Sequence, residues 1–522
     1  MNSSQSENTT RIAKNVILLY GRMLLSMVIS LYASRVVLST LGVEDYGIYG
    51  VVGGFVAMLS TVFSSLSTAV GRFLTFELGK GDQDSLNRTF STSLIIHAIM
   101  AISLLLIIEA IGLWFLNTKM NIPAERMYAA NWVFQCSVFG LILAIINVPY
   151  AAAIISHERM TAYAYIGLFD IVLRLLIVLL LAYASLGVDK LIVYAVLCFG
   201  SGLLVVTIYI TYGRKHFVEC RYGFSLDKKI LRDMLGFSGW NFVGTSATAL
   251  KDQGVNILLN LFCGPVVNAA RGLAFSVNAA VSSFVGNFMT ALNPQITKSY
   301  ASGERDYTIF LVQRGARFSF YILLILVLPL FFEADFVLTL WLKNYPEHTT
   351  NFVRLVLLLS LCDSLSHTLV TLQLATGKIR NYQIVVGGMS LMNFPVSYVL
   401  LKMRYAPETT MVTAIIISLC CLLLRLIMLR KTAQLSVRNY LMSVLGNVLL
   451  VSACAVILPS IVYYNFATDG VVRFIFIGAT CVISTSAIIF GIGCSRGERA
   501  FIWQKCVVTY NTLRSKMKSN GK

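Results

Sequence analysis

The chain has 522 residues, of which 57% are apolar and only 13% are charged, and its formal net charge at pH 7 is +18. Soluble domains carry about 25% charged residues, so this composition excludes a water-soluble globule. Apolar runs of about 20 residues match the roughly 30 Å hydrocarbon core of a bilayer, and such runs recur along the whole sequence. We therefore expect an all-α integral membrane protein.

In chain order, the apolar segments predict fourteen transmembrane helices. The first six cover residues 15–38, 46–72, 91–116, 129–152, 161–183 and 190–212. Six more cover 238–262, 267–294, 311–332, 352–375, 382–401 and 409–429, and two additional helices cover 440–464 and 471–494. The expected organisation is a cytoplasmic N-terminal segment at 1–14, a six-helix bundle at 15–212, a cytoplasmic linker at 213–236, a second six-helix bundle at 237–430, two C-terminal helices at 431–494, and a cytoplasmic tail at 495–522.

Orientation follows from the positions of the basic residues, because cytoplasmic loops carry an excess of Lys and Arg. With the N terminus in the cytoplasm, most of the 42 basic residues fall in loops that face the cytoplasm. Both termini are then cytoplasmic, which requires an even number of spans. The positive net charge therefore indicates topology, and we expect no nucleic-acid partner.

The two halves of the chain contain an internal repeat. Sliding the sequence by 222 residues without gaps aligns small residues in and around the second span with small residues in and around the eighth. The matched pairs include Gly42 with Gly264, Gly50 with Gly272, Thr75 with Thr297, and Gly81 with Gly303. Six spans separate the copies, so both have the same orientation. This predicts a parallel pseudo-two-fold repeat with its axis along the membrane normal, as alternating-access transporters use.

Both repeated spans are rich in small and hydrogen-bonding residues, in the stretches STVFSSLSTAVG at 60–71 and SVNAAVSSFVGNFMTALN at 276–293. Small residues allow close helix packing in a membrane. The same hydroxyls and amides also suit a wet cavity that meets sugar hydroxyls. Both interpretations stay open, and they can hold on different faces of one helix.

Several stretches carry a resemblance to a known family: RIAKNVILLYGRMLLSMVISLYASRVVLSTLGVEDYGIYGVVGG, GRFLTFELGKGD, PVVNAARGLAF, NPQITKSYASGERD and LATGKIRNYQ. They resemble the polysaccharide transporter branch of the multidrug/oligosaccharidyl-lipid/polysaccharide (MOP) exporter superfamily, the Wzx-type flippases. The resemblance implies transport of an undecaprenyl-pyrophosphate-linked oligosaccharide across the bacterial inner membrane, for O-antigen, capsule or exopolysaccharide synthesis. Membrane lipids, a polysaccharide polymerase and chain-length machinery are the implied partners.

Moving a pyrophosphate through hydrocarbon unpaired costs many kcal/mol, so a flippase cavity needs cations. The bases that we assign to the spans are Arg22, Arg35, Arg174, Lys251 and Arg271. Lys251 and Arg22 are the leading candidates, and resemblance to the superfamily, including lipid II flippases with basic first and eighth spans, favours Arg22 and adds Arg271.

These bases also have structural interpretations. Arg271 and Arg35 lie near the outer boundary, from which a long side chain reaches the interface. Arg174 follows Asp170 by four residues, which suits an ion pair on one helix face. Lys251 is expected to pair only weakly with Asp252, because neighbouring side chains point about 100° apart on a helix.

The intramembrane acids raise the question of energy coupling. Glu109, Asp170, Asp252 and Asp363 are candidates for protonation or Na⁺ binding during a transport cycle. Asp363 and His367 are spaced to share a helix face at i and i+4, which suits either a proton relay or an inert hydrogen-bonded pair. The driving force, whether a proton, Na⁺ or the membrane potential, stays open.

No catalytic or metal-binding motif such as HExxH, a P-loop or GxSxG with partners is present, so we expect a transporter without a cofactor rather than an enzyme. Two alternatives remain. A membrane glycan polymerase or ligase is also polytopic, although it needs larger external loops. A multidrug exporter of the same superfamily carries cationic drugs, which favour an acidic cavity rather than these bases.

Reporter fusions test the predicted topology without any substrate. Fusions within 213–236 and after residue 500 are expected to report cytoplasm, and fusions near residues 340 and 467 are expected to report periplasm, because of the distribution of basic residues. A cytoplasmic signal near 467 contradicts the fourteen-span topology.

Overall fold

The computed structural model describes residues 60–118, 122–183, 188–221, 225–342, 345–465 and 470–500, Trp503, and short separate stretches between 15 and 52. The described residues form helices and no strands. Eleven helical segments among them are long and apolar enough to cross a membrane, and a shorter apolar helix covers Leu18–Ile29. Helices suit this setting because a bilayer offers no water to satisfy backbone N–H and C=O groups.

The eleven segments coincide with eleven of the predicted spans. The first two predicted spans fall partly outside the described residues. The seventh lies in α8, which is not among the eleven and contains the charged residues Lys251 and Asp252. The all-helical membrane fold is therefore confirmed, and the count of fourteen stays a prediction.

The helices of the first half are α2 (Ser60–Lys80), α3 (Gln83–Ile107), α4 (Leu113–Thr118), α5 (Met127–Ser156), α6 (Met160–Tyr183) and α7 (Lys190–His216). Those that follow are α8 (Lys228–Cys263), α9 (Pro265–Ala301), α10 (Arg305–Phe332), α11 (Ala334–Leu342), α12 (Thr349–Ser364), α13 (His367–Ala375), α14 (Arg380–Leu391), α15 (Asn393–Lys402) and α16 (Thr409–Thr432). The C-terminal helices are α17 (Val437–Tyr440), α18 (Asn447–Asn465) and α19 (Val471–Ile488).

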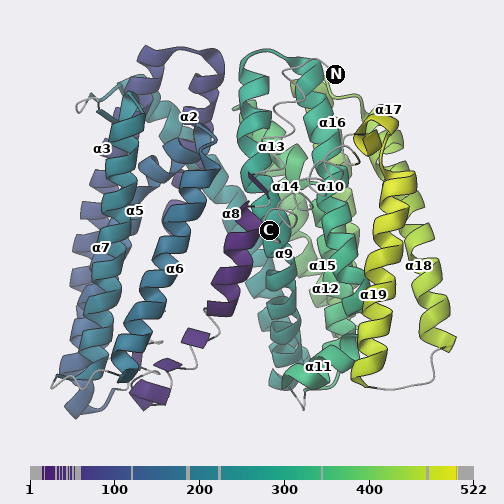
Figure 1. Ribbon diagram of the computed structural model, residues 1–522, viewed down its shortest axis with the longest axis horizontal. Coiled ribbons are helices and arrows are strands. Elements are labelled where there is room, and N and C mark those ends of the chain that lie inside the picture. The colour runs from purple at the N-terminus through teal and green to yellow at the C-terminus, as the bar shows by residue number, and fades with distance from the viewer. Residues whose placement is uncertain are drawn as a thin grey trace, which may run out of the picture. The chain divides into compact units, whose positions relative to one another are not determined.

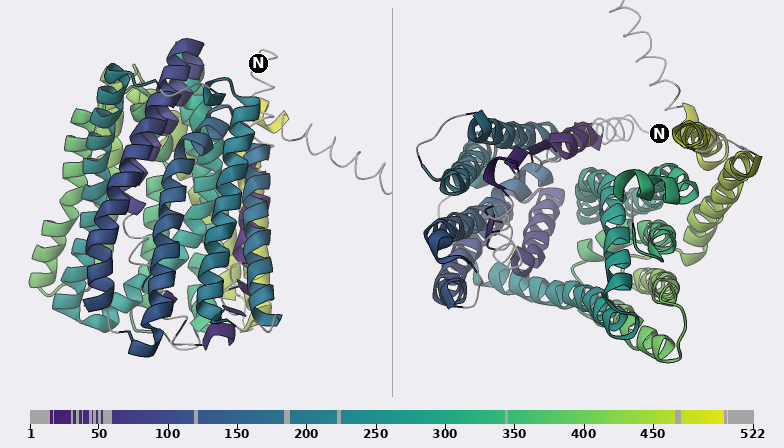
Figure 2. Two further views of the ribbon diagram at one scale, coloured as in Figure 1. Left: turned by 90° about the vertical axis from the view of Figure 1, so that its left-hand side faces the viewer. Right: turned by 90° about the horizontal axis from the view of Figure 1, so that it is seen from below.

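The chain divides into two compact units. The first comprises residues 1–248, 287–308 and 371–387, and the second comprises 249–286, 309–370 and 388–522. In the first unit α5 packs against α2, α3 and α7 (Figure 1). In the second unit α16 packs against α12 and α15, and α18 and α19 lie side by side at the yellow end of the chain (Figure 2). The bundle boundaries expected from the sequence stay a prediction.

The internal repeat is visible in the backbone. Gly42 and its repeat mate Gly264 have φ angles of +83° and +86°, and Gly81 and its mate Gly303 have φ angles of +76° and +80°. Residues with a side chain rarely adopt these left-handed values, whereas glycine does so without strain. The same glycine turn therefore comes before and after the repeated span in both copies, which confirms the repeat.

The C-terminal ends of α2 and α9 meet at repeat-related residues of the first unit. A Cβ atom added to Gly79 would lie 2.7 Å from the Cβ of Ala301 and 2.7 Å from the carbonyl oxygen of Lys298. Gly79 and Ala301 are themselves 222 residues apart. Beside this contact, Lys298 Nζ lies 2.9 Å from Glu158 Oε1, and Gln295 donates to the other oxygen of this buried carboxylate. The close approach therefore requires that position 79 carry no side chain, and a paired charge lies beside it.

Replacing Gly79 by Ala tests this contact. The added methyl group meets backbone atoms of α9, so the purified variant is expected to lose about 1–3 kcal/mol of stability, seen as a lower thermal unfolding midpoint in detergent. Gly71→Ala is the matched control on the same helix, because a Cβ added there meets nothing within 4 Å. Equal midpoints for the two variants contradict the close approach.

Candidate functional site

The first unit contains a cavity of about 650 Å³, which lies within the usual range for pockets that bury small ligands. Helices from five parts of the chain line it. They contribute Ser26, Tyr49, Cys136, Ser137, Gly140, Asp170, Arg174, Tyr194, Cys198, Phe199, Ser201 and Gly202, among others. A Cβ added to Gly140 or Gly202 would meet nothing within 4 Å, so the two glycines leave space that larger residues would fill.

Asp170 and Arg174 lie one turn apart on α6 and both line the cavity. Arg174 Nε donates to both carboxylate oxygens of Asp170, at 3.3 and 3.2 Å, which confirms the ion pair predicted from the i,i+4 spacing. The Arg174 side chain is 67% exposed. Its two terminal amino groups donate to none of the residues that the structure describes, so they are available to a ligand.

The cavity also has an aromatic wall. The rings of Tyr49 and Tyr194 are tilted by 59° with their centroids 4.9 Å apart. Phe199 on α7 contributes a third ring. Among the lining residues only Asp170 and Arg174 carry charge, so the formal charge of the lining is zero.

A second group of candidates gathers in the second unit, where α8 is followed by α9. Lys251 Nζ lies 3.5 Å from Asp252 Oδ1, and Arg271 Nη2 lies 4.0 Å from the same oxygen. The expectation that this pairing is weak stays a prediction, and Asp252 has Arg271 as a second neighbour. The long lysine side chain spans the angle between neighbouring helix positions, so adjacency does not prevent contact. Two bases share one carboxylate, which leaves a formal charge of +1.

Arg271 is deeply buried and does not reach the interface. Its side chain is 5% exposed, donates to the Asn256 side chain and stacks on Phe275, with 4.2 Å from Cζ to the ring centroid. Its Nε atom is buried without a hydrogen-bond partner among the described residues. The snorkelling interpretation of Arg271 is therefore wrong, because polar and aromatic groups surround the guanidinium inside the unit.

Arg22 lies on the short helix Leu18–Ile29 and contacts α6 in the first unit. Its guanidinium stacks over Tyr163, 4.6 Å from the ring centroid, and approaches the Tyr163 carbonyl oxygen at 3.5 Å. A Cβ on Gly167 would lie 2.7 Å from Arg22 Nη1. The absence of a side chain at Gly167 therefore makes room for the guanidinium. Arg35 lies outside the described residues.

Two of the predicted acids have different environments. Glu109 lies in a π-helical turn, Ile108–Gly112, where Gln135 donates to Oε2 at 3.0 Å. Its other oxygen, Oε1, is buried without a partner among the described residues. Asp363 accepts a hydrogen bond from Ser418 on α16.

The predicted helix face shared by Asp363 and His367 is interrupted. Helix α12 ends at Ser364 and α13 begins at His367, so a short turn separates the two residues, and their role as a pair stays a prediction. Residues from distant elements hydrogen-bond to polar groups of this turn. The Tyr440 hydroxyl donates to the Leu365 carbonyl oxygen at 2.7 Å, and Arg425 Nη1 donates to Ser366 Oγ at 3.0 Å. A local pattern cannot reveal partners that lie so far along the chain.

Several bases inside helical spans were missed by the sequence analysis. Arg425 lies in α16, and Arg72 in α2 donates to the Leu374 and Ala375 carbonyl oxygens at 3.3 and 3.1 Å. The signal was present, because Arg425 lies within the predicted span 409–429. Among the described residues, no group of three or more His, Cys, Asp or Glu side chains is placed to hold a metal ion.

Two further missed bases anchor the segment after the last span. Arg314 and Arg317 on α10 contact Glu498 at 2.6 and 2.9 Å. Burial raises the pKa of Glu498, but the Ser495 amide and the two guanidinium groups outweigh it and hold that pKa below its ordinary value. This carboxylate is therefore ionised at neutral pH and ties the C-terminal segment to α10.

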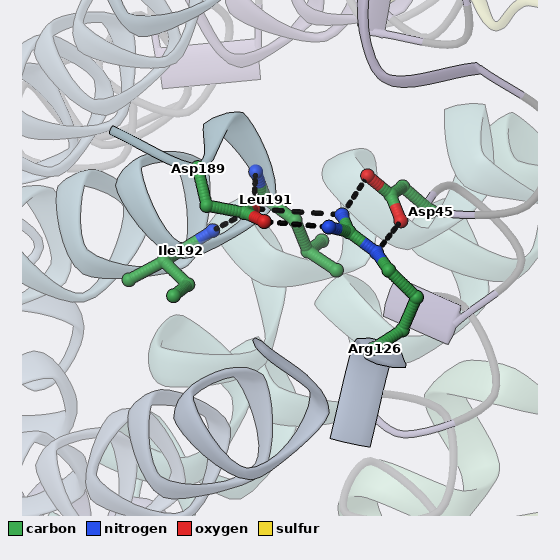
Figure 3. Close-up of polar contacts among 5 residues, drawn as sticks. All are labelled: Asp45, Arg126, Asp189, Leu191 and Ile192. Carbon is green, nitrogen blue, oxygen red and sulfur yellow. Dashed lines mark hydrogen bonds and ion pairs between the residues drawn. The ribbon is translucent and has the colours of Figure 1, made fainter. Parts of the chain in front are cut away.

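A charged network at the start of α5 was also missed (Figure 3). Arg126 Nε donates to Asp45 at 2.7 Å and its Nη1 donates to Asp189 at 2.6 Å. Asp189 also accepts from the amides of Leu191 and Ile192, so it caps α7. The partners are 81 and 63 residues away from Arg126. One guanidinium therefore links three connecting segments of the first unit.

Replacing Arg126 by Gln leaves two carboxylates without their cation. The free energy of unfolding is expected to fall by about 1–3 kcal/mol, measured from the thermal midpoint in detergent. Arg126→Lys keeps the positive charge but loses the planar guanidinium that donates to two carboxylates at once. Its midpoint should therefore lie between those of Arg126→Gln and the native protein. Arg159→Gln, which removes an exposed base before α6, serves as control. A native midpoint for Arg126→Gln contradicts a stabilising network.

Comparison with known proteins gives fold-level similarity. No family model matches the chain. The uncharacterized membrane protein EpsK of Bacillus subtilis is 23% identical over 325 residues, which are 61% of this chain and 63% of EpsK. The chain thus spans less than two thirds of that relative.

Solved transporters cover more of the chain. A MATE transporter in the bent conformation has a TM-score of 0.70 at 14% identity over 83% of this chain and 98% of its own. A MOP superfamily transporter from Pyrococcus furiosus has a TM-score of 0.68 at 13% identity, covering 82% and 96%. The MATE transporter ClbM in complex with Rb⁺ has a TM-score of 0.65 at 16% identity, with the same coverage. The chain is a multi-pass membrane protein with the fold of the MOP-superfamily transporters.

Proposed function

We propose that this protein is a flippase that moves undecaprenyl-pyrophosphate-linked oligosaccharide from the cytoplasmic to the periplasmic leaflet of a bacterial inner membrane by alternating access. Both termini would be cytoplasmic, and the cargo would be a repeat unit for surface polysaccharide or lipopolysaccharide. A polymerase and its chain-length machinery would receive the product. The transporter fold and the Wzx-like stretches of the sequence support this proposal.

The cluster of Lys251, Asp252 and Arg271 carries the proposal. A buried base is costly in a membrane unless it is paired, and here two bases compete for one carboxylate. Arg271 also holds a buried Nε donor without a partner among the described residues. A pyrophosphate supplies the missing negative charge and acceptor oxygens, and guanidinium groups bind phosphate with paired hydrogen bonds. The cluster therefore suits an anionic headgroup.

A multidrug exporter of the same superfamily is the second candidate, because MATE transporters share the fold. An organic cation needs an unpaired carboxylate in its site. Asp170 is paired with Arg174, and Asp252 lies between two bases. These pairings favour the anionic cargo. A membrane glycan polymerase receives less support, since the similar solved structures described above are transporters.

Deletion of the protein in its native host separates the three functions. Loss of the flippase is expected to stop surface glycan and to accumulate complete, unpolymerised repeat units on undecaprenyl pyrophosphate at the cytoplasmic face. Units that already face the periplasm without being polymerised indicate a polymerase instead. Normal glycan together with hypersensitivity to drugs indicates an exporter, and either result overturns the proposal.

Charge substitutions test the bases directly. Lys251→Gln and Arg22→Gln are expected to lower glycan output per unit of membrane-inserted protein about tenfold or more, since losing a charged contact of 1.4 kcal/mol costs a factor of ten. Lys251→Arg should retain more activity than Lys251→Gln. Arg22→Lys should be only partly active, because Lys lacks the paired N–H donors of a guanidinium.

Lys402→Gln, at an exposed position that ends α15, is the matched control and should keep full output. If the bases are structural instead, removing one strands a buried charge and lowers protein abundance while output falls only in proportion. Full specific activity in both Arg22→Gln and Lys251→Gln ends the hypothesis of cationic binding.

A further inference from the structure

The cavity of the first unit has a chemistry distinct from the basic cluster of the second. We propose that this cavity binds a neutral sugar residue of the cargo. The sugar ring would stack on Tyr49 and Tyr194, and its hydroxyl groups would hydrogen-bond to Asp170 and Arg174. This inference rests on the proposed flippase function and names the part of the cargo that the cavity takes.

The charge of the lining selects a neutral ligand. Asp170 and Arg174 are the charged residues of the lining and are paired with each other at 3.2 Å. An organic cation would meet Arg174 as a like charge, and a pyrophosphate would meet Asp170 as a like charge. Like charges repel each other more strongly in a low-dielectric site than in water. A ligand with hydroxyl groups and no charge meets neither penalty.

The ion pair matches the hydrogen-bonding capacity of a sugar. Each hydroxyl both donates and accepts, whereas a carboxylate only accepts and a guanidinium only donates. Asp170 and Arg174 present these two functions side by side on one face of α6. Arg174 uses only Nε in the pair, so its terminal amino groups can donate to ring hydroxyls. Adjacent sugar hydroxyls can therefore bridge the pair without breaking it.

The aromatic wall matches the other face of a sugar ring. A pyranose has an apolar face of C–H groups, and rigid aromatic rings provide large apolar contact area next to a polar edge. The rings of Tyr49 and Tyr194 lie next to each other, tilted relative to one another, on one side of the cavity. Ser137 and Ser201 add hydroxyl groups to the lining. The cavity therefore combines apolar and hydrogen-bonding surfaces, which are the two kinds of surface that an uncharged, hydroxyl-rich ring presents.

Two native cysteines report on occupancy. Cys136 and Cys198 line the cavity, whereas Cys454 lies on α18 in the other unit. The purified protein is treated with a small maleimide in the presence of free hexoses, N-acetylhexosamines, inorganic pyrophosphate or tetraphenylphosphonium, and mass spectrometry gives the labelling rate of each cysteine. We expect at least one sugar to slow labelling of Cys136 and Cys198 several-fold, with Cys454 unchanged.

Pyrophosphate and tetraphenylphosphonium should give no protection. Protection by either ion, or no protection by any sugar of the panel, overturns the inference. The two proposals fail separately. If deletion accumulates lipid-linked units while sugars give no protection, only the sugar site is wrong. If sugars protect but deletion leaves lipid-linked intermediates unchanged, the flippase function is wrong and the sugar site stands.

A pair of glycine variants on α7 separates binding from folding. A side chain at Gly202 enters the cavity, whereas Gly200 lies two residues earlier and does not line it; a Cβ meets nothing within 4 Å at either position. Saturation-transfer NMR of a protecting sugar should show binding to native protein and Gly200→Leu, and at least a fivefold weaker signal with Gly202→Leu at an equal unfolding midpoint. Equal signals for both variants place the sugar elsewhere and overturn the site.

Discussion

The structure depends on one electrostatic constraint: an ionised side chain within hydrocarbon must have a partner or a polar cavity. The described intramembrane charges follow it in different ways. Asp170 and Arg174 neutralise each other at the edge of a cavity. Lys251 and Arg271 share Asp252 and stay short of negative charge. The second arrangement is the less satisfied one, and the proposed anionic cargo would supply the missing negative charge.

The repeat shows how one fold provides two kinds of surface. Gly50 and Gly272 are repeat mates, so the residues that precede them, Tyr49 and Arg271, occupy equivalent positions. In the first copy this position carries an aromatic wall of a neutral cavity, and in the second it carries a buried cation. The backbone turns are kept in both copies while the side-chain chemistry differs. The proposed cargo, which has a neutral sugar part and a charged phosphate part, would need two such different surfaces.

Sequence reasoning succeeded where the physics is local. Apolar runs fix the spans because each run must satisfy its own backbone in the bilayer, and the i,i+4 spacing was enough to predict the pair of Asp170 and Arg174. It failed where side-chain direction matters. Counting residues from a boundary placed Arg271 near the interface, but the distance along a helix does not tell which way the guanidinium points. The network of Arg126 was missed because its partners lie on other connecting segments.

The break between α12 and α13 shows why ionisable residues and irregular backbone occur together in a membrane. Ending α12 at Ser364 frees carbonyl groups that hydrocarbon cannot satisfy, so Tyr440 and Arg425 donate to the turn that follows. The guanidinium of Arg425 beside this turn in its turn requires polar surroundings, which also accommodate Asp363 and His367. The broken backbone and the charges therefore stabilise each other.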